Sequence, residues 1–128
     1  FKPLKAIASS GEMARVMLAL KTVLVSQDSI PVLVFDEVDS NIGGETAGVV
    51  GKKMKRIGAR RQVLCITHLA PVAAAAHRHY LVSKEIVEGR TLTRVVQLDD
   101  TSRVQELTRM LGGGGAAARQ HAEELLKA

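Results

Sequence analysis

The stretch Pro31-Val32-Leu33-Val34-Phe35-Asp36-Glu37-Val38-Asp39 decides the fold. Its run of β-branched and aromatic residues, apolar without alternation, predicts a strand buried on both faces. Such strands lie centrally in parallel sheets, where ligands bind at the carboxyl ends of the strands. Adjacent carboxylates such as Asp36 and Glu37 there suit magnesium and water chemistry, in which one acid fixes the hydrated cation and its neighbour orients and deprotonates a water. On these residues alone, an acidic solvated turn is an equally good interpretation.

The composition fits one soluble α/β domain over residues 1–128, with 46% hydrophobic residues to build a core. One cysteine allows no internal disulfide and favours a reducing cytoplasm. Cys65 lies in an apolar strand, so we expect a structural thiol. No run reaches a membrane span, no signal peptide is visible, and a start at Phe1 favours a fragment or a processed product. The net charge of +5 permits a polyanionic partner, whereas 2% aromatic residues argues against base-stacking surfaces.

A helix is predicted after the turn Ser9-Ser10-Gly11-Glu12, with Ser9 or Ser10 as its cap. The periodicity predicts a buried face made of Met13, Val16, Met17, Leu20 and Leu24. A small-residue turn that opens a helix is also an anion site, because free N–H groups and the helix dipole point outward. Taken alone, the turn favours a capped helix without a ligand.

A second helix is predicted over residues 45–57, after a Gly-rich turn, with Gly58 as its C-cap. Its predicted buried face comprises Ala47, Val50, Met54 and Ile57. A basic cluster lies off that face and just beyond it, at Lys52, Lys53, Lys55, Arg56, Arg60 and Arg61. The favoured interpretation is a solvated face that complements the helix dipole, and the alternative is a contact with DNA phosphates.

Residues 62–67 form the second predicted strand, which ends at His68. A right-handed crossover between neighbouring parallel strands brings His68 to the same sheet edge as Asp36 and Glu37, where it can donate to a phosphate or a water. Downstream we expect an alanine-rich helix over 71–76, a hairpin with its turn at Glu88-Gly89, and two terminal helices. The predicted caps of the first terminal helix are Thr101 or Ser102, with Gln105 in the capping box, and the second helix spans 116–127. A zinc site at His77 and His79 is disfavoured, because no cysteine or carboxylate lies near in sequence.

The order and spacing of five pieces resemble a known family: residues 7–15, 35–39, 62–69, 82–84 and 106–111. Together they resemble the carboxyl-terminal lobe of the ATPase head in the RecN family of bacterial DNA repair proteins. These are relatives of the SMC proteins within the ABC-type ATPase class. The resemblance covers nearly the whole chain. It implies a three-layer, P-loop NTPase-like lobe with a mostly parallel sheet, lacking the phosphate-loop half.

The resemblance also implies roles for particular residues. Asp36 matches the Walker B aspartate that holds magnesium through its water shell. Glu37 matches the general base for attack on the γ-phosphate, and His68 matches the histidine that senses that phosphate. The signature motif, which contacts nucleotide on the opposite head, matches Ser9, Ser10, Gly11 and Glu12, and the loop that communicates across the dimer matches Asn41 to Gly44, including Gly43.

The implied cofactors are ATP and Mg²⁺. The implied partners are the amino-terminal lobe of the same protein, a second copy in a head-to-head dimer, and DNA through the full-length protein, with no membrane partner. The implied location is the cytoplasm, in association with the nucleoid. Double-strand-break repair and recombination is the implied process.

Three departures and one absence qualify the match. Ser10 stands where the family has glycine, so it either crowds the backbone or adds a hydroxyl donor; Asn41 replaces glycine and Gly43 replaces serine. No G-x-x-x-x-G-K-[ST] phosphate loop is present, so we expect the chain alone neither to bind ATP tightly nor to hydrolyse it. Two alternatives remain: an ABC transporter lobe, disfavoured because Val38 rather than proline follows Glu37, and a non-catalytic α/β interaction module.

Overall fold

The computed structural model describes residues 8–24 and 29–128. It confirms a mixed α/β fold with a parallel strand pair. The sequence also predicts a short lead-in over residues 1–8 and a polar loop at residues 27–29; residues 1–7 of the first and residues 27 and 28 of the second lie outside the described residues. Within the described ranges, no helix has both the length and the apolar character needed to cross a bilayer.

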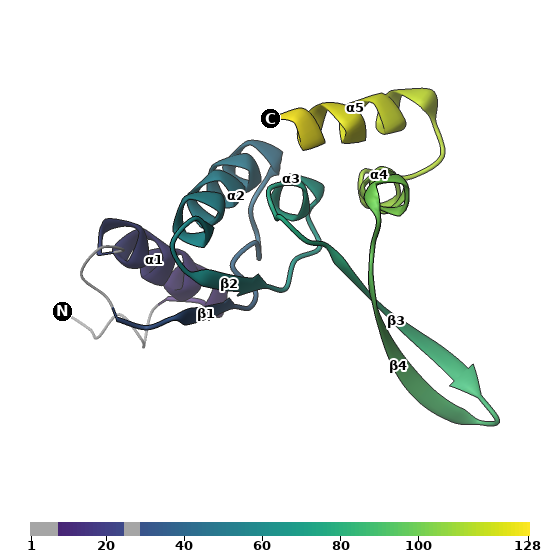
Figure 1. Cartoon of the computed structure of the whole chain (residues 1–128), viewed down its shortest axis with the longest axis horizontal. Helices are drawn as coiled ribbons and strands as arrows, with labels where there is room; N and C mark the ends of the chain where they lie inside the picture. Colours follow the sequence, from purple (N-terminus) through teal and green to yellow (C-terminus); the bar gives the residue numbers. More distant parts are fainter. Residues whose placement is uncertain (1–7, 25–28) are drawn as a thin grey trace.

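The first half of the chain is a crossover unit preceded by a helix. Its elements are α1 (Ser10–Val23), β1 (Val32–Phe35), α2 (Gly44–Gly58) and β2 (Gln62–Cys65). The strands β1 and β2 pair in parallel, with register from Val32↔Gln62 to Phe35↔Cys65. Both helices lie on one face of the strand pair, as Figure 1 shows. The main core forms there, around Leu18, Phe35, Val38, Ala47, Val50, Met54, Ile57 and Val72.

The opposite face of the strand pair is open. Along β1 burial alternates, and Val34 on the outer face is 64% exposed; on the second strand and just beyond it, Leu64 is 48% and Ile66 63% exposed. The expectation of a strand buried on both faces is therefore wrong for this chain. The physical reason is that the side chains alternate between faces and no described element packs on the outer one.

The buried face of α1 also differs from the prediction. Gly11, Leu18 and Thr22 are buried, with Ala14 packed beside them. The predicted stripe is instead half-buried at Met13 and exposed at the other four positions, by 41% to 51%: Val16, Met17, Leu20 and Leu24. Small residues such as Gly11 and Ala14 let this side of α1 approach the core closely. This side is therefore buried in place of the more apolar stripe. Consequently α1 presents an apolar stripe that no described element covers.

The predicted face of α2 is confirmed: Ala47, Val50, Met54 and Ile57 are all buried. Gly58, expected as the cap, is instead the last helical residue, and Ala59 caps the helix in right-handed geometry. No left-handed residue is therefore needed at this end, because the chain continues directly into the turn before β2.

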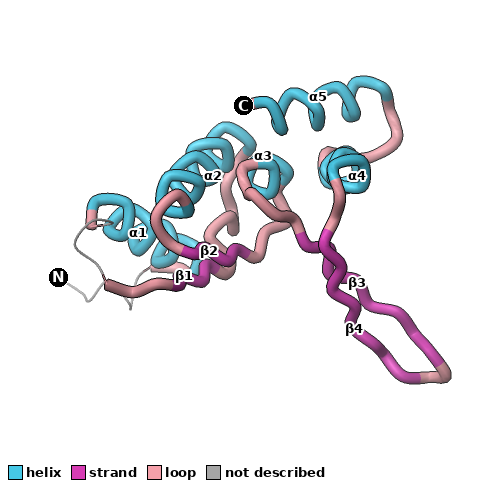
Figure 2. The backbone as a smooth tube through the Cα atoms, viewed as in Figure 1, coloured by secondary structure: helices cyan, strands magenta, loops and turns pink. Residues whose placement is uncertain are grey.

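The second half of the chain comprises a hairpin and three helices. Its elements are α3 (Ala70–Ala74), β3 (Tyr80–Val87), β4 (Arg90–Gln97), α4 (Asp100–Met110) and α5 (Ala116–Lys127). The predicted hairpin is confirmed, with Glu88 and Gly89 at positive φ in its turn. It is a separate antiparallel sheet that projects away from the helices, as Figure 2 shows. A second core joins α3, α4 and α5, through Ala70, Ala73, Ala74, Leu107 and Ala122.

The cap of α4 differs from the prediction. Asp99 is the N-cap, and its carboxylate accepts a hydrogen bond of 2.7 Å from the backbone N–H of Ser102. Thr101 and Ser102, the predicted caps, therefore lie inside the helix, and the predicted capping box with Gln105 does not form. Asp99, Thr101 and Ser102 all offer a polar side chain near the first turn of α4. The ionised carboxylate of Asp99 is the strongest hydrogen-bond acceptor of the three, so it caps the helix.

Candidate functional site

The carboxyl ends of β1 and β2 form one edge. Phe35 and Cys65 are partners in register, and the N–H of Ile66 donates to the carbonyl of Phe35 at 3.0 Å. The chain leaves both strands at this edge. The acids Asp36 and Glu37 follow β1, and Thr67 and His68 follow β2. The structure thus brings the predicted acids and the predicted histidine to the same edge of the strand pair.

Glu37 is held in an unusual backbone conformation. Its φ is 57°, in the left-handed region that costs a non-glycine residue about 1–3 kcal/mol. The N–H of Ser40 donates to the Glu37 carbonyl at 3.0 Å, closing the turn. The hydroxyl of Ser10 donates to Oε2 of Glu37 at 2.5 Å, which ties the first residue of α1 to the strand end. The Ser10 hydroxyl therefore donates to Glu37 within the chain, and its effect on the approach to a phosphate stays a prediction.

Asp39 positions His68. Its carboxylate is 2% exposed, and Oδ2 accepts from the Thr67 hydroxyl and, at 3.0 Å, from the His68 N–H. The same oxygen lies 3.3 Å from Nδ1 of His68, whose ring is 69% exposed. His68 therefore contacts Asp39 rather than Asp36 or Glu37 among the interactions of the described residues. Neither Asp39 nor Thr67 was assigned a role from the sequence, although both are polar residues in the segments that follow the two strands.

Two residues of α1 fix the loop after β1. The Arg15 guanidinium donates to the carbonyls of Val38 at 3.2 Å and Ser40 at 2.9 Å. A Cβ placed on Gly11 would lie 2.9 Å from Ser40 Cβ and 3.0 Å from the Glu37 carbonyl oxygen. Close approach of α1 to this loop therefore requires glycine at position 11. No contact of Arg15 was predicted from the sequence. The available signal was its position one helical turn after Gly11, which places both residues on the same face of α1.

Ser9 and Glu12 satisfy each other. The Ser9 N–H and hydroxyl both donate to Oε2 of Glu12 at 2.8 Å, and the Glu12 N–H donates to the Ser9 hydroxyl at 3.3 Å. The backbone hydrogen bond from Ser9 is the main reason that the pKa of Glu12 lies below its ordinary value. This capping box fixes the start of α1, and of the two predicted caps Ser9 is the one used.

The loop before α2 contains the remaining predicted residues. Asn41 is exposed at φ 58°, whereas Gly43 is the N-cap of α2 with φ −87°. The turn therefore places its left-handed conformation on asparagine and not on its glycines. Among the described residues, neither Asn41 nor Gly43 forms a hydrogen bond or ion pair with Asp36, Glu37 or His68.

The donor set fits Mg²⁺. Among residues 8–24 and 29–128, no three carboxylate, imidazole or thiol groups gather into a metal cage. Magnesium in nucleotide sites is bound by one or two carboxylates, and waters and phosphate oxygens complete its coordination. The exposed carboxylate of Asp36 can supply the protein ligand.

The Cys65 thiol takes no part in this chemistry. Burial is the main cause that raises the pKa of the Cys65 thiol to about 12, so the thiol stays protonated and unreactive.

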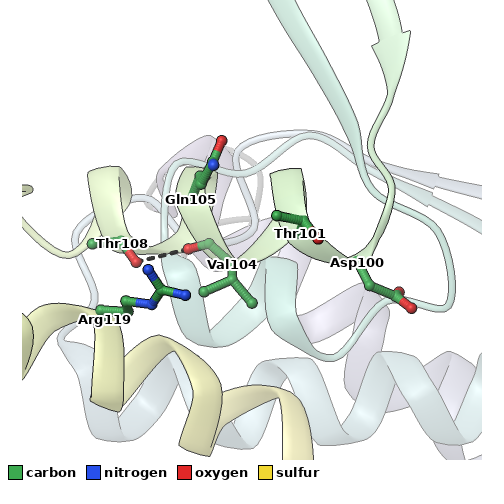
Figure 3. A pocket seen from close by; sticks show the side chains of 6 residues that line it. All are labelled: Asp100, Thr101, Val104, Gln105, Thr108 and Arg119. Atoms are coloured by element: carbon green, nitrogen blue, oxygen red, sulfur yellow. Dashed lines mark hydrogen bonds between the residues drawn. The ribbon is translucent and has the colours of Figure 1, made fainter.

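A separate hollow of about 450 Å³ lies between α4 and α5, as Figure 3 shows. Arg119 reaches toward Thr108, whose hydroxyl donates to the Val104 carbonyl at 2.7 Å. Asp100, Thr101 and Gln105 complete its lining. None of these residues lies at the β1–β2 edge, so the hollow is not part of the candidate site.

The fold occurs in SMC-type ATPase heads. The SMC head domain from Thermotoga maritima matches 73% of this chain and 34% of its own, at 31% identity and a TM-score of 0.55. A structure from work on ATP-driven dimerization and DNA-stimulated activation of SMC ATPases matches 89% of this chain and 68% of its own, at 22% identity and a TM-score of 0.59. The fold of this chain is therefore the one found in SMC ATPase heads.

Sequence comparison identifies the particular homologue. The chain is homologous to a segment of DNA repair protein RecN, which confirms the predicted resemblance. It is 46% identical to the protein of Xylella fastidiosa strain Temecula1 over 94% of the chain, 49% to that of Treponema pallidum over 99%, and 43% to that of Bacillus subtilis over 98%. The chain spans 22% of the length of each of these relatives. No protein-family model matches it.

Proposed function

We propose that this chain supplies the carboxyl-terminal lobe of an ATP-hydrolysing head in a RecN-type protein of double-strand-break repair. One observation carries the proposal: two side-chain contacts gather three elements at the β1–β2 edge. Ser10 joins the start of α1 to Glu37, and Asp39 joins the end of β1 to His68. The homology to RecN and the SMC head fold support the same assignment.

The residues at this edge have separate tasks in the proposed reaction. Asp36 would hold Mg²⁺ through its water shell, and the chemistry supplied there would be neutralisation of charge on the phosphate oxygens. Glu37 accepts the proton of the attacking water through a carboxylate oxygen. Because Nδ1 of His68 lies against Asp39, Nε2 is the ring nitrogen that would donate to the γ-phosphate.

The proposed site needs surfaces from outside this chain. The amino-terminal lobe of the full-length protein supplies the phosphate loop and covers the exposed outer face of β1 and β2. A second copy meets the start of α1 and the loop at Asn41 and Gly43 in a head-to-head dimer. The proposed location is the nucleoid in the cytoplasm. Without the phosphate loop, the chain alone binds ATP weakly and does not turn it over.

Asp36→Asn in the full-length protein tests the assignment. We expect the Mg²⁺ concentration that gives half-maximal ATP turnover to rise at least roughly tenfold, since a ligand of the metal's water shell is lost. Asp100→Asn is the matched control, because Asp100 is an exposed aspartate at the start of α4. Titration of Mg²⁺ at saturating ATP measures both variants. An unchanged Mg²⁺ dependence in Asp36→Asn would refute the assignment.

A further inference from the structure

Positive charge is concentrated in one short stretch of this chain. The chain has 18 cations against 13 acids, and six of those cations lie within residues 52–61. The other 12 cations are therefore outnumbered by the 13 acids, so the rest of the chain is net −1. No aspartate or glutamate occurs between Glu45 and Glu85. The net charge of +5 is thus a property of one ten-residue segment.

The structure places four of these cations on the outer side of α2 and Arg60 just beyond its end. The buried face of that helix is occupied by Val50, Met54 and Ile57. Five cations are exposed, and none is paired with a carboxylate in the described part of the chain: Lys52, Lys53, Lys55, Arg56 and Arg60. We call these five residues the α2 basic face.

The fold itself does not account for this face. Only Lys55 and Arg56 lie in the last turn of α2, where cations complement the helix dipole. Lys52 and Lys53 lie before it. Lys52 and Arg56 are one turn apart, and like charges at that spacing destabilise a helix. An external anion would neutralise this unpaired charge and offset its repulsion within the helix.

The nucleotide is not that anion. Figure 1 shows α2 returning from the carboxyl edge of β1 and β2 to their amino edge. Lys52 lies eight residues beyond Gly44 and Arg56 lies 12 beyond it, which places them roughly 12 and 18 Å along the helix axis. The α2 basic face is therefore directed away from the proposed ATP site.

We propose that the α2 basic face binds the sugar-phosphate backbone of duplex DNA. This inference rests on the proposed function in DNA repair. Lys52 and Arg56 are separated by about 6 Å along the axis, which is comparable with two base-pair steps of roughly 3.4 Å. No aromatic residue lies between Phe35 and Tyr80, so the face lacks the stacking groups that single strands use. An interfacial membrane helix is disfavoured, because the apolar side of α2 is buried in the core.

The test compares two triple variants of the full-length protein with the same change of charge. The first is Lys52→Gln/Lys53→Gln/Arg56→Gln. The control is Arg90→Gln/Arg119→Gln/Lys127→Gln, which removes three exposed cations from the hairpin and α5. Fluorescence anisotropy with a duplex of about 30 base pairs measures affinity between roughly 50 and 200 mM salt.

We expect the α2 triple variant to lose affinity roughly tenfold or more near 100 mM salt. Its plot of log affinity against log salt should become shallower by about 2 to 3, because each phosphate contact contributes about 0.9 to the slope. The control should change affinity less than about threefold, since non-contacting charges are largely screened at this salt. A triple Lys/Arg-exchanged variant, Lys52→Arg/Lys53→Arg/Arg56→Lys, should bind like the parent.

Equal losses of DNA affinity in both Gln variants would overturn the proposal, and so would an unchanged DNA affinity in the α2 variant. It would also be overturned if the α2 variant bound DNA like the parent but lost binding to vesicles containing phosphatidylserine. ATP turnover without DNA is measured in parallel. If the parent protein shows no turnover, the proposed ATPase function fails while the DNA titration still decides the role of the α2 basic face. Equal thermal unfolding of all variants confirms that the comparison concerns binding and not folding.

Discussion

At the scale of single residues, Glu37 combines a strained backbone with a restrained side chain. Its φ of 57° is stabilised by the Ser40 N–H, and its carboxylate accepts the hydroxyl of Ser10. Strain of this kind persists where the surrounding structure over-determines a residue. The restraint keeps one carboxylate oxygen occupied, so in the proposed reaction Ser10 would compete with a water that approaches the same atom.

Removing the Ser10 hydroxyl should therefore raise ATP turnover by the full-length protein. We expect Ser10→Ala to increase the rate roughly two- to tenfold, because a net hydrogen bond is worth about 0.5–1.5 kcal/mol and 1.4 kcal/mol is a factor of ten. Ser10→Thr retains a hydroxyl and should match the parent. Steady-state phosphate release measures all three proteins, and a slower Ser10→Ala variant would contradict this role for Ser10.

At the scale of elements, replacing two helical glycines by alanine should change the free energy of unfolding in opposite directions. Gly11→Ala adds a Cβ within 3.0 Å of the Ser40 side chain and the Glu37 carbonyl, so we expect a loss of about 1–3 kcal/mol from overpacking. Gly48→Ala meets no atom within 4 Å, so we expect a gain of about 0.5–1 kcal/mol in helix stability. Denaturant unfolding of both variants measures the free energies. Equal effects would show that α1 does not pack on this loop as described.

The helices also show what sequence patterns can and cannot predict. The apolar stripe of α2 is its buried face, because the helix meets only one core. The stripe of α1 is exposed, because small residues such as Gly11 and Ala14 approach the core more closely. A sequence pattern identifies an apolar face but not the surface that covers it.

The candidate site was only partly predictable. The turn and charge motifs at the β1–β2 edge were visible in the sequence, whereas the contacts of Asp39, Thr67 and Arg15 depend on tertiary geometry.

At the scale of the whole molecule, the described residues form two small cores and leave one face of the β1–β2 pair uncovered among themselves. Val34, Leu64 and Ile66 expose 48% to 64% of their surface on that face. The lack of alternation in this strand predicted burial on both sides. The sequence pattern therefore agrees with a larger assembly, in which another lobe packs on the outer face of β1 and β2.

Val34→Lys should then have different effects in two settings. In the chain alone the residue is largely solvated, so we expect a change within about 0.5 kcal/mol. In the full-length protein, with the face covered as proposed, the same lysine would be buried without a partner, and we expect a loss of about 3–5 kcal/mol. Gln120→Lys, on the exposed side of α5, is the control in both settings. Unfolding by denaturant measures the difference, and equal small effects in both proteins would show that the face stays open.

The most direct measurement of the central claim is ATP hydrolysis by the full-length protein carrying Glu37→Gln. Glu88→Gln is a matched control, because Glu88 is also a glutamate at positive φ and lies in the hairpin turn. Our account predicts that Glu37→Gln lowers turnover roughly 10²- to 10⁴-fold, the usual contribution of a general base, with nucleotide affinity unchanged. It predicts full activity for Glu88→Gln. Turnover by Glu37→Gln at more than about half the parent rate would contradict the account.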